Sequence, residues 1–266
     1  MKVLLTGSSS LLGAQVVRQL VQRGDTVRVM QRRPSDVAEE LGLEQHLGEV
    51  VDETVATAAV AGVDTVIHLA ARVGVVGTRK QFFDTNVVGT RVVLAAAQNA
   101  GVQRFVFVSS PSVAHTGTAL AGQGAEAADP RHAKGEYSKS KALAEKEVLA
   151  ADGAGIATIA VRPHLVWGPG DTQLIGRIVE RARQGRLALV AGGRPLIDTT
   201  YLDNAADAVI AAADRAQAGH GRAFIVSNGE PRTVEDIVAR IFEAAGERAP
   251  ERAVPRAASW GAGAVV

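Results

Sequence analysis

The sequence predicts an α/β protein with a Rossmann-type, doubly wound parallel sheet and a smaller C-terminal substrate lobe. In residues 1–162, short apolar runs alternate with segments of helical periodicity, which is typical of parallel strands covered by helices on both faces. Beyond Arg162 the pattern loosens and paired glycines interrupt it. We therefore expect a dinucleotide-binding domain over residues 1–162. Residues 163–266 should form a mixed region, in which a smaller lobe is interleaved with the last elements of the sheet.

Each element follows from its local pattern. Short apolar runs rich in β-branched and aromatic residues predict strands at Val3–Leu5, Thr26–Met30, Thr65–Leu69, Phe105–Val108, Ile156–Arg162 and Ala223–Val226. Apolar residues repeated every three or four positions predict helices at Leu11–Arg23, Thr54–Ala61, Asn86–Ala100, Tyr137–Ala150, Gln173–Gln184, Asn204–Ala218 and Val234–Ala245. The final segment, Ala249–Val266, has little periodicity and no capping signal. We expect this end either to continue in the natural protein or to need a partner.

Composition excludes several function classes. Of the 266 residues, 47% are hydrophobic and 21% charged, with a formal net charge of +1, so a large core is expected and a nucleic-acid partner is not. The chain has no cysteine, which rules out disulfides and thiolate catalysis. Histidines and carboxylates show no ligand spacing, so no metal is expected. Without a signal-peptide layout or an apolar stretch of about 18 residues, we expect a cytoplasmic protein with no membrane partner.

A glycine-containing turn connects the first predicted strand to the first predicted helix. Such a turn directs backbone N–H groups and the positive end of the helix dipole towards a pyrophosphate. Ser10 stands where the middle of three glycines is expected, and its small side chain still suits the turn. The alternative is an ordinary tight turn. The residues expected to bind the dinucleotide here are Gly7, Ser9, Ser10, Leu11, Leu12 and Gly13.

The end of the second predicted strand indicates which dinucleotide is bound. An acid here usually holds the ribose 2′-hydroxyl of NAD, whereas an arginine suits the 2′-phosphate of NADP. The sequence offers no acid but has Arg32 and Arg33, of which Arg32 is the better candidate. We therefore expect NADP, with NAD still possible. The alternative is a solvated charge pair in a loop. Glu49 and Val50, farther along the chain, should lie near the adenine.

Tyr137 and Lys141 form a candidate acid/base pair. Positions four apart lie on one helical face, so both side chains should point the same way. A free phenol has a pKa of about 10, and a neighbouring ammonium would lower that pKa towards neutrality. The alternative is an exposed tyrosine beside a surface lysine. The pair gains weight from Ser109-Ser110-Pro111-Ser112, which ends the predicted strand Phe105–Val108.

Several short motifs occur in the order found in one enzyme family, and together they cover nearly the whole chain. They are Thr6-Gly7, Gly13, His68-Leu69-Ala70-Ala71, Asn86-Val87-Val88-Gly89-Thr90, Ser109-Ser110, Tyr137 with Lys141, Arg162-Pro163 and Trp167-Gly168-Pro169-Gly170-Asp171. The chain resembles the extended short-chain dehydrogenase/reductases, which include the NAD-dependent epimerases and dehydratases. Segments 111–115, 162–174 and 198–205 resemble the 3β-hydroxysteroid dehydrogenase-like branch, and most of all the bacterial 2-alkyl-3-oxoalkanoate reductases of olefin biosynthesis.

The resemblance implies a role for each catalytic candidate. Tyr137 would be the general acid/base, and Lys141 would hold the nicotinamide ribose and lower the tyrosine pKa. Ser110 would hydrogen-bond the substrate oxygen, with Ser112 as the alternative if the register is shifted. Asn86 would be the helix asparagine behind the site. The competing interpretation of Asn86 is a helix cap.

The resemblance also implies lining residues. The cofactor would lie against Leu69, Ala70, Ala71, Val108, Pro163 and Val166. His115 and His164 are candidates to face a substrate carboxylate, and Trp167 would either line the substrate site or belong to the core. His68 is expected to be a packed histidine rather than a proton carrier.

These roles predict an NAD(P)-dependent oxidoreductase that interconverts a ketone and a secondary alcohol. We expect it to reduce a 2-alkyl-3-oxoalkanoate, a β-keto acid, to the β-hydroxy acid. The alternatives are a sterol or 3β-hydroxysteroid dehydrogenase, a nucleotide-sugar epimerase or dehydratase, and a protein that binds NADP without turnover. The alanine-rich helices at Asn86–Ala100 and Tyr137–Ala150 resemble the family's dimer interface, so a homodimer is expected.

Overall fold

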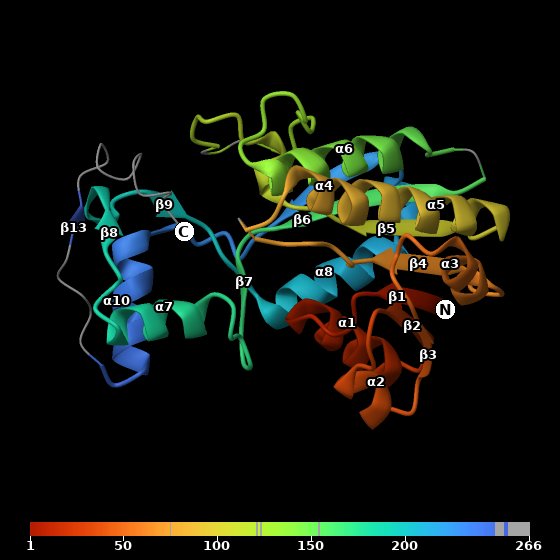
Figure 1. Ribbon diagram of the computed structural model, residues 1–266, viewed down its shortest axis with the longest axis horizontal. Helices are drawn as coiled ribbons and strands as arrows, with labels where there is room; N and C mark the ends of the chain where they lie inside the picture. Colours follow the sequence, from red (N-terminus) through yellow and green to blue (C-terminus); the bar gives the residue numbers. More distant parts are fainter. Residues whose placement is uncertain (75, 121, 123, 154, 248–252, 255–266) are drawn as a thin grey trace. The chain divides into compact units, whose positions relative to one another are not determined.

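Seven parallel strands form the central sheet of the computed structural model (Figure 1). The structure describes residues 1–266 except 75, 121, 123, 154, 248–252 and 255–266. Across the sheet the strand order is β11-β6-β5-β4-β1-β2-β3. The strands are β1 Lys2–Thr6, β2 Thr26–Gln31, β3 Glu44–Leu47, β4 Thr65–His68, β5 Arg104–Val108, β6 Ala157–Pro163 and β11 Arg222–Val226. The order reverses between β1 and β4, which confirms the predicted doubly wound sheet.

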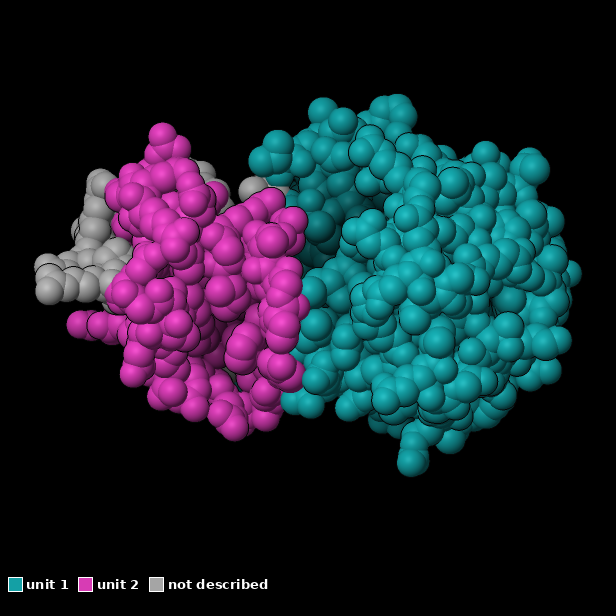
Figure 2. Space-filling model, turned by 90° about the horizontal axis from the view of Figure 1, so that it is seen from below, with its two compact units in different colours: residues 1–164, 202–226 teal, residues 165–201, 227–266 magenta. Residues whose placement is uncertain are grey.

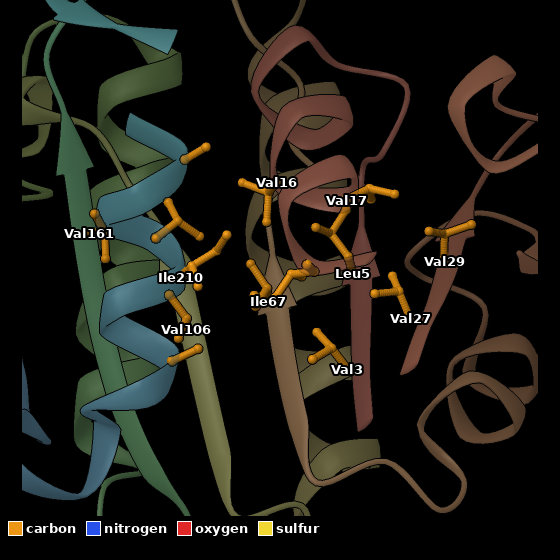
Figure 3. Close-up of a cluster of buried hydrophobic side chains, with 14 of the residues drawn as sticks. Val3, Leu5, Val16, Val17, Val27, Val29, Ile67, Val106, Val161 and Ile210 are labelled. Carbon is orange, nitrogen blue, oxygen red and sulfur yellow. The ribbon is translucent and has the colours of Figure 1, made fainter. Parts of the chain in front are cut away.

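Helices cover both faces of this sheet because successive strand residues point to opposite sides. Val3 and Leu5 of β1 pack under α1 (Leu11–Gln22) and α8 (Leu202–Asp214), with Val16 and Ile210 among their neighbours (Figure 3). Leu4 belongs to the opposite core. That core is closed by α3 (Glu53–Val60), α5 (Gly89–Asn99) and α6 (Glu136–Ala150). The remaining helices of this part are α2 (Asp36–Glu40), α4 (Arg79–Phe83) and α9 (Ala216–Gly219).

The chain divides into two compact units (Figure 2). Unit 1 comprises Met1–His164 and Leu202–Val226, so α8 and β11 return to the sheet after the chain has left it. Unit 2 comprises Leu165–Tyr201 and Ser227–Val266. Three two-stranded pairs, β7–β10, β9–β12 and β8–β13, accompany two helices in unit 2. Its elements are β7 Val166–Trp167, α7 Ile175–Arg183, β8 Leu189–Val190, β9 Leu196–Ile197, β10 Thr200–Tyr201, β12 Arg232–Thr233, α10 Val234–Ala244 and β13 Ala253–Val254.

Two predicted helices differ from the structure. The helix predicted from Asn86 begins seven residues earlier, at Arg79, because Thr78 and Gln81 form a capping box there. It continues from α4 through a π-helical segment, Asp84–Val88, into α5. The helix predicted over Asn204–Ala218 is divided into α8 and α9. The predictions for Ala249–Val266 lie largely outside the described residues. Within the described chain, no helix has both the length and the apolar character needed to cross a membrane.

Candidate active site

The glycine turn between β1 and α1 is closed by hydrogen bonds and tight packing. The Ser10 hydroxyl accepts from the Gly13 N–H at 3.0 Å and donates to the Gly7 carbonyl at 2.9 Å, so serine caps α1. Gly7 has φ +83°, and a Cβ there would lie 2.9 Å from the Ala70 nitrogen. A Cβ on Gly13 would overlap the Gly7 carbonyl oxygen. Any residue larger than glycine would clash at both positions. The turn leads directly into the 12-residue helix α1.

A cavity of about 600 Å³ lies beside this turn. Its lining residues are Ser9, Arg32, Arg33, Pro34, Gly48 and Glu49. Arg32 and Arg33 are exposed, and neither makes an ion pair with the residues that the structure describes. Two unpaired guanidinium groups suit a phosphate, which they can bind through several N–H groups. Val50, which is expected near the adenine, is buried beside Gly89.

Gln31 occupies the end of β2, where an NAD site usually has an acid. Its side chain is buried, accepts a hydrogen bond from Ser8 Oγ and donates to Gln45 Oε1 at 2.8 Å. Gln45 Oε1 also accepts from the Ser35 N–H at 3.1 Å. The end of β2 therefore carries a neutral amide whose oxygen and nitrogen both form hydrogen bonds with other side chains of the protein.

Ser110 and Tyr137 meet at the carboxyl end of β5. Ser110 follows the strand in extended conformation, with φ −152°, as the following proline favours. Its hydroxyl is hydrogen-bonded to Ser112 Oγ at 2.9 Å and lies close enough to the Tyr137 phenol to influence its pKa. Burial raises the pKa of the Tyr137 phenol, and the nearby Ser110 hydroxyl offsets only part of that rise. The phenol is therefore protonated at neutral pH.

Lys141 lies one turn along α6, with its ammonium inside the protein. Nζ donates to the Val108 carbonyl at 2.6 Å and lies 3.8 Å from the centroid of the Phe107 ring. Burial lowers the pKa of Lys141 to about 7, and the Glu145 carboxylate opposes this only partly. The expected lowering of the Tyr137 pKa is wrong in this structure, because burial dominates at Tyr137. The alternative of a surface lysine is also wrong, since Lys141 is 2% exposed.

Asn86 is a buried connecting residue and not a helix cap. Its Oδ1 accepts from the Arg72 N–H at 2.7 Å, and its Nδ2 donates to the Arg72 carbonyl at 3.0 Å and to Ser140 Oγ at 2.9 Å. Ser140 Oγ in turn donates to the Tyr137 carbonyl at 2.8 Å. The capping interpretation is wrong because the helix begins earlier, at Arg79. Asn86 instead connects the segment after β4 to the tyrosine-bearing helix.

His68 is a packed histidine, as expected. It is fully buried at the end of β4, where Nδ1 lies 2.8 Å from Thr6 Oγ1 and Nε2 lies 3.0 Å from Thr90 Oγ1. Burial lowers its pKa to about 3, with a further contribution from the nearby Lys141 charge. The imidazole is therefore neutral and holds β1, β4 and α5 together.

The other candidates are divided between the two units. In unit 1, Leu69, Ala70 and Ala71 follow β4, while Val108 and Pro163 end β5 and β6. His115 and His164 are half-buried in the same unit. Val166 and Trp167 form β7 in unit 2, where the Trp167 indole donates to Thr199 Oγ1 at 3.1 Å and packs edge-on against Tyr201. In the described part of the chain, no group of three histidines or carboxylates is placed to hold a metal ion.

Comparison with known proteins identifies the family. Residues 4–256 match the model of the 3-beta hydroxysteroid dehydrogenase/isomerase family. The chain belongs to this family. It is 40% identical to 2-alkyl-3-oxoalkanoate reductase of Stenotrophomonas maltophilia, over 100% of this chain and 82% of that protein. It is 34% identical to 3 beta-hydroxysteroid dehydrogenase/Delta 5-->4-isomerase of Mycobacterium tuberculosis, over 94% of this chain and 71% of that protein.

The chain also has the fold of solved structures. MoeE5 in complex with UDP-glucose and NAD superposes with a TM-score of 0.82 at 27% identity, covering 96% of this chain and 85% of that one. The predicted family, the Rossmann-type fold and the oxidoreductase class are thereby confirmed.

Sequence reasoning did not single out Gln31, Arg72 or Ser140. Ser140 lies three residues after Tyr137, a spacing that puts it on a nearby part of the helix surface and could have identified it. Arg72 directly follows the Leu69–Ala71 run, and a charged residue at that place is a usable signal. Gln31 has no such signal, because its partners come from two other segments of the chain.

Proposed function

We propose that this family member is an NADP-dependent reductase that converts a β-keto acid to the β-hydroxy acid. The observation that supports it most is the position of the Tyr137 phenol, next to Ser110 after the end of β5 and one helical turn from the buried Lys141. A phenol that keeps its proton at neutral pH can donate that proton to a ketone oxygen.

The residues around the glycine turn fit a nicotinamide dinucleotide. Gly7 and Gly13 leave no room for a Cβ, and the first turn of α1 is available to a pyrophosphate. Arg32 would bind the 2′-phosphate, since Gln31 offers no carboxylate for a 2′-hydroxyl. A bound dinucleotide supplies the hydride for the reaction.

Three side chains would then act on the substrate and its surroundings. Tyr137 would donate its proton to the ketone oxygen, and the Ser110 hydroxyl would donate a hydrogen bond to the same atom as negative charge develops. Lys141 would hold the nicotinamide ribose from the carboxyl end of β5. Asn86 would keep the tyrosine helix in place through Ser140.

The β-keto acid is proposed from the relative that is 40% identical over the whole chain and is named a 2-alkyl-3-oxoalkanoate reductase. A second candidate, a 3β-hydroxysteroid, is favoured by the relative at 34% identity. Homodimerisation through α5 and α6, and a cytoplasmic location, remain predictions from the resemblance.

A substrate screen with Tyr137→Phe tests the proposal. The parent enzyme should oxidise NADPH with 3-oxo acids of some chain length, and faster than with 3-oxosteroids. Removing the hydroxyl should lower kcat/KM by about 10²- to 10⁴-fold, the usual contribution of general acid–base catalysis. Thermal unfolding of the variant should stay close to the parent, which separates catalysis from folding. Unchanged activity in Tyr137→Phe would refute the role of Tyr137. A parent active only on steroids would favour the second candidate.

A further inference from the structure

We propose that Arg72 binds the carboxylate of the substrate acid. This inference rests on the proposed function and names the residue that would distinguish an acid from a neutral ketone. Arg72 follows Ala71 directly, on the segment that leaves the end of β4.

Hydrogen bonds hold the Arg72 backbone to the catalytic helix. Both its N–H and its carbonyl bond to the Asn86 side chain, at 2.7 and 3.0 Å. Asn86 bonds to Ser140, and Ser140 bonds to the carbonyl of Tyr137. The helices α4 and α6 also pack against each other (Figure 1). The Arg72 backbone is therefore held to the backbone of the tyrosine helix by three consecutive hydrogen-bonded links.

The Arg72 guanidinium lacks a carboxylate partner among the described residues, whereas two cations on α4 and one on α6 have one. Arg79 and Lys139 both face Glu136, at 4.0 and 3.3 Å, and Lys80 pairs with Asp84. The Nε of Arg72 is buried and makes no hydrogen bond within the described chain. Among the described residues, the Arg72 Nη2 donates to the Val76 carbonyl, at 3.4 Å. A half-buried cation with spare donors suits an incoming carboxylate, which can accept two N–H groups.

The surroundings of the guanidinium suit the rest of a fatty β-keto acid. The guanidinium lies 5.5 Å from the centroid of the Phe82 ring, which limits where its N–H groups point. The guanidinium has space only because residue 77 is glycine, where a Cβ would approach Arg72 Nε to 2.8 Å. On the same segment, Val73 and Val76 are 67% and 81% exposed. Two exposed valines beside an unpaired cation match a ligand with a carboxylate and alkyl chains.

Paired substrates test this assignment directly. A 2-alkyl-3-hydroxy acid and its methyl ester are oxidised by the NADP⁺-loaded enzyme, and kcat/KM is measured for each. In Arg72→Ala, the ratio of acid to ester kcat/KM should fall by about ten- to a hundred-fold, as expected for a lost hydrogen-bonded charge. Arg72→Lys should recover part of the ratio. Lys80→Ala removes an exposed charge eight residues away and should leave the ratio unchanged.

The possible outcomes separate the two proposals. Equal losses on acid and ester in Arg72→Ala would overturn the inference, because a purely structural role lowers both, and would leave the proposed function standing. The same ratio change in Lys80→Ala would also overturn it, since general electrostatics would then be the cause. A parent inactive on both substrates refutes the proposed function and this inference with it.

Discussion

Replacing Lys141 by methionine should change how the stability of the protein depends on pH. Burial lowers the pKa of Lys141 from 10.5 to about 7 in the folded chain. The unfolded chain therefore binds a proton between these values that the folded chain releases, so stability rises with pH across this window. The destabilisation caused by burying Lys141 is complete below about pH 7 and disappears as pH rises through 10.5. At about 1.4 kcal/mol per pH unit, the whole effect is on the order of 5 kcal/mol.

Urea unfolding at two pH values measures this effect. Between about pH 7.5 and about pH 9.5, the parent should gain about 3 kcal/mol relative to Lys141→Met, because other titrating groups cancel in the difference. The loss of the hydrogen bond to the Val108 carbonyl shifts the variant by a similar amount at both pH values. Lys146→Met, at an exposed position on the same helix, serves as the control and should show no such gain. If the stability difference between the parent and Lys141→Met stayed constant within about 0.5 kcal/mol between the two pH values, the lowered pKa of Lys141 would be refuted.

Two further predictions concern the ion pair between Arg162 and Glu145 of α6 and the choice of dinucleotide. Glu145→Ala should lower the free energy of unfolding by about 3–5 kcal/mol, because Arg162 and Glu145 are each 1% exposed and the guanidinium would remain charged without its carboxylate. A loss below about 1 kcal/mol in chemical denaturation would contradict this reasoning. Arg32→Ala should weaken NADPH binding by about ten- to a hundred-fold and leave NADH binding unchanged, as followed by fluorescence titration. Equal weakening of both, or a parent that prefers NADH, would exclude Arg32 as the 2′-phosphate ligand.

The sequence by itself determined most of the sheet and its helices. Their signals are local: β1 and α1 are specified by apolar runs and by a glycine turn that need no distant partner. The Tyr137–Lys141 spacing is equally local, since four positions along a helix always share a face. The predicted start at Asn86 was wrong because the cap that begins this helix, at Thr78, precedes the part with clear periodicity.

Only the tertiary structure decided how the candidate site works. Asn86 and Ser140 meet across 54 residues of sequence, and the Lys141 ammonium bonds to Val108, 33 residues away. Whether the pKa of Tyr137 is raised or lowered depends on burial by the surrounding segments, which outweighs the influence of Ser110. Arg72 becomes a candidate ligand-binding residue only when its lack of a carboxylate partner among the described residues is compared with the ion pairs of the cations on α4 and α6. Periodicity records which face of an element is buried, but contacts between distant segments set the charges and hydrogen bonds on which the chemistry depends.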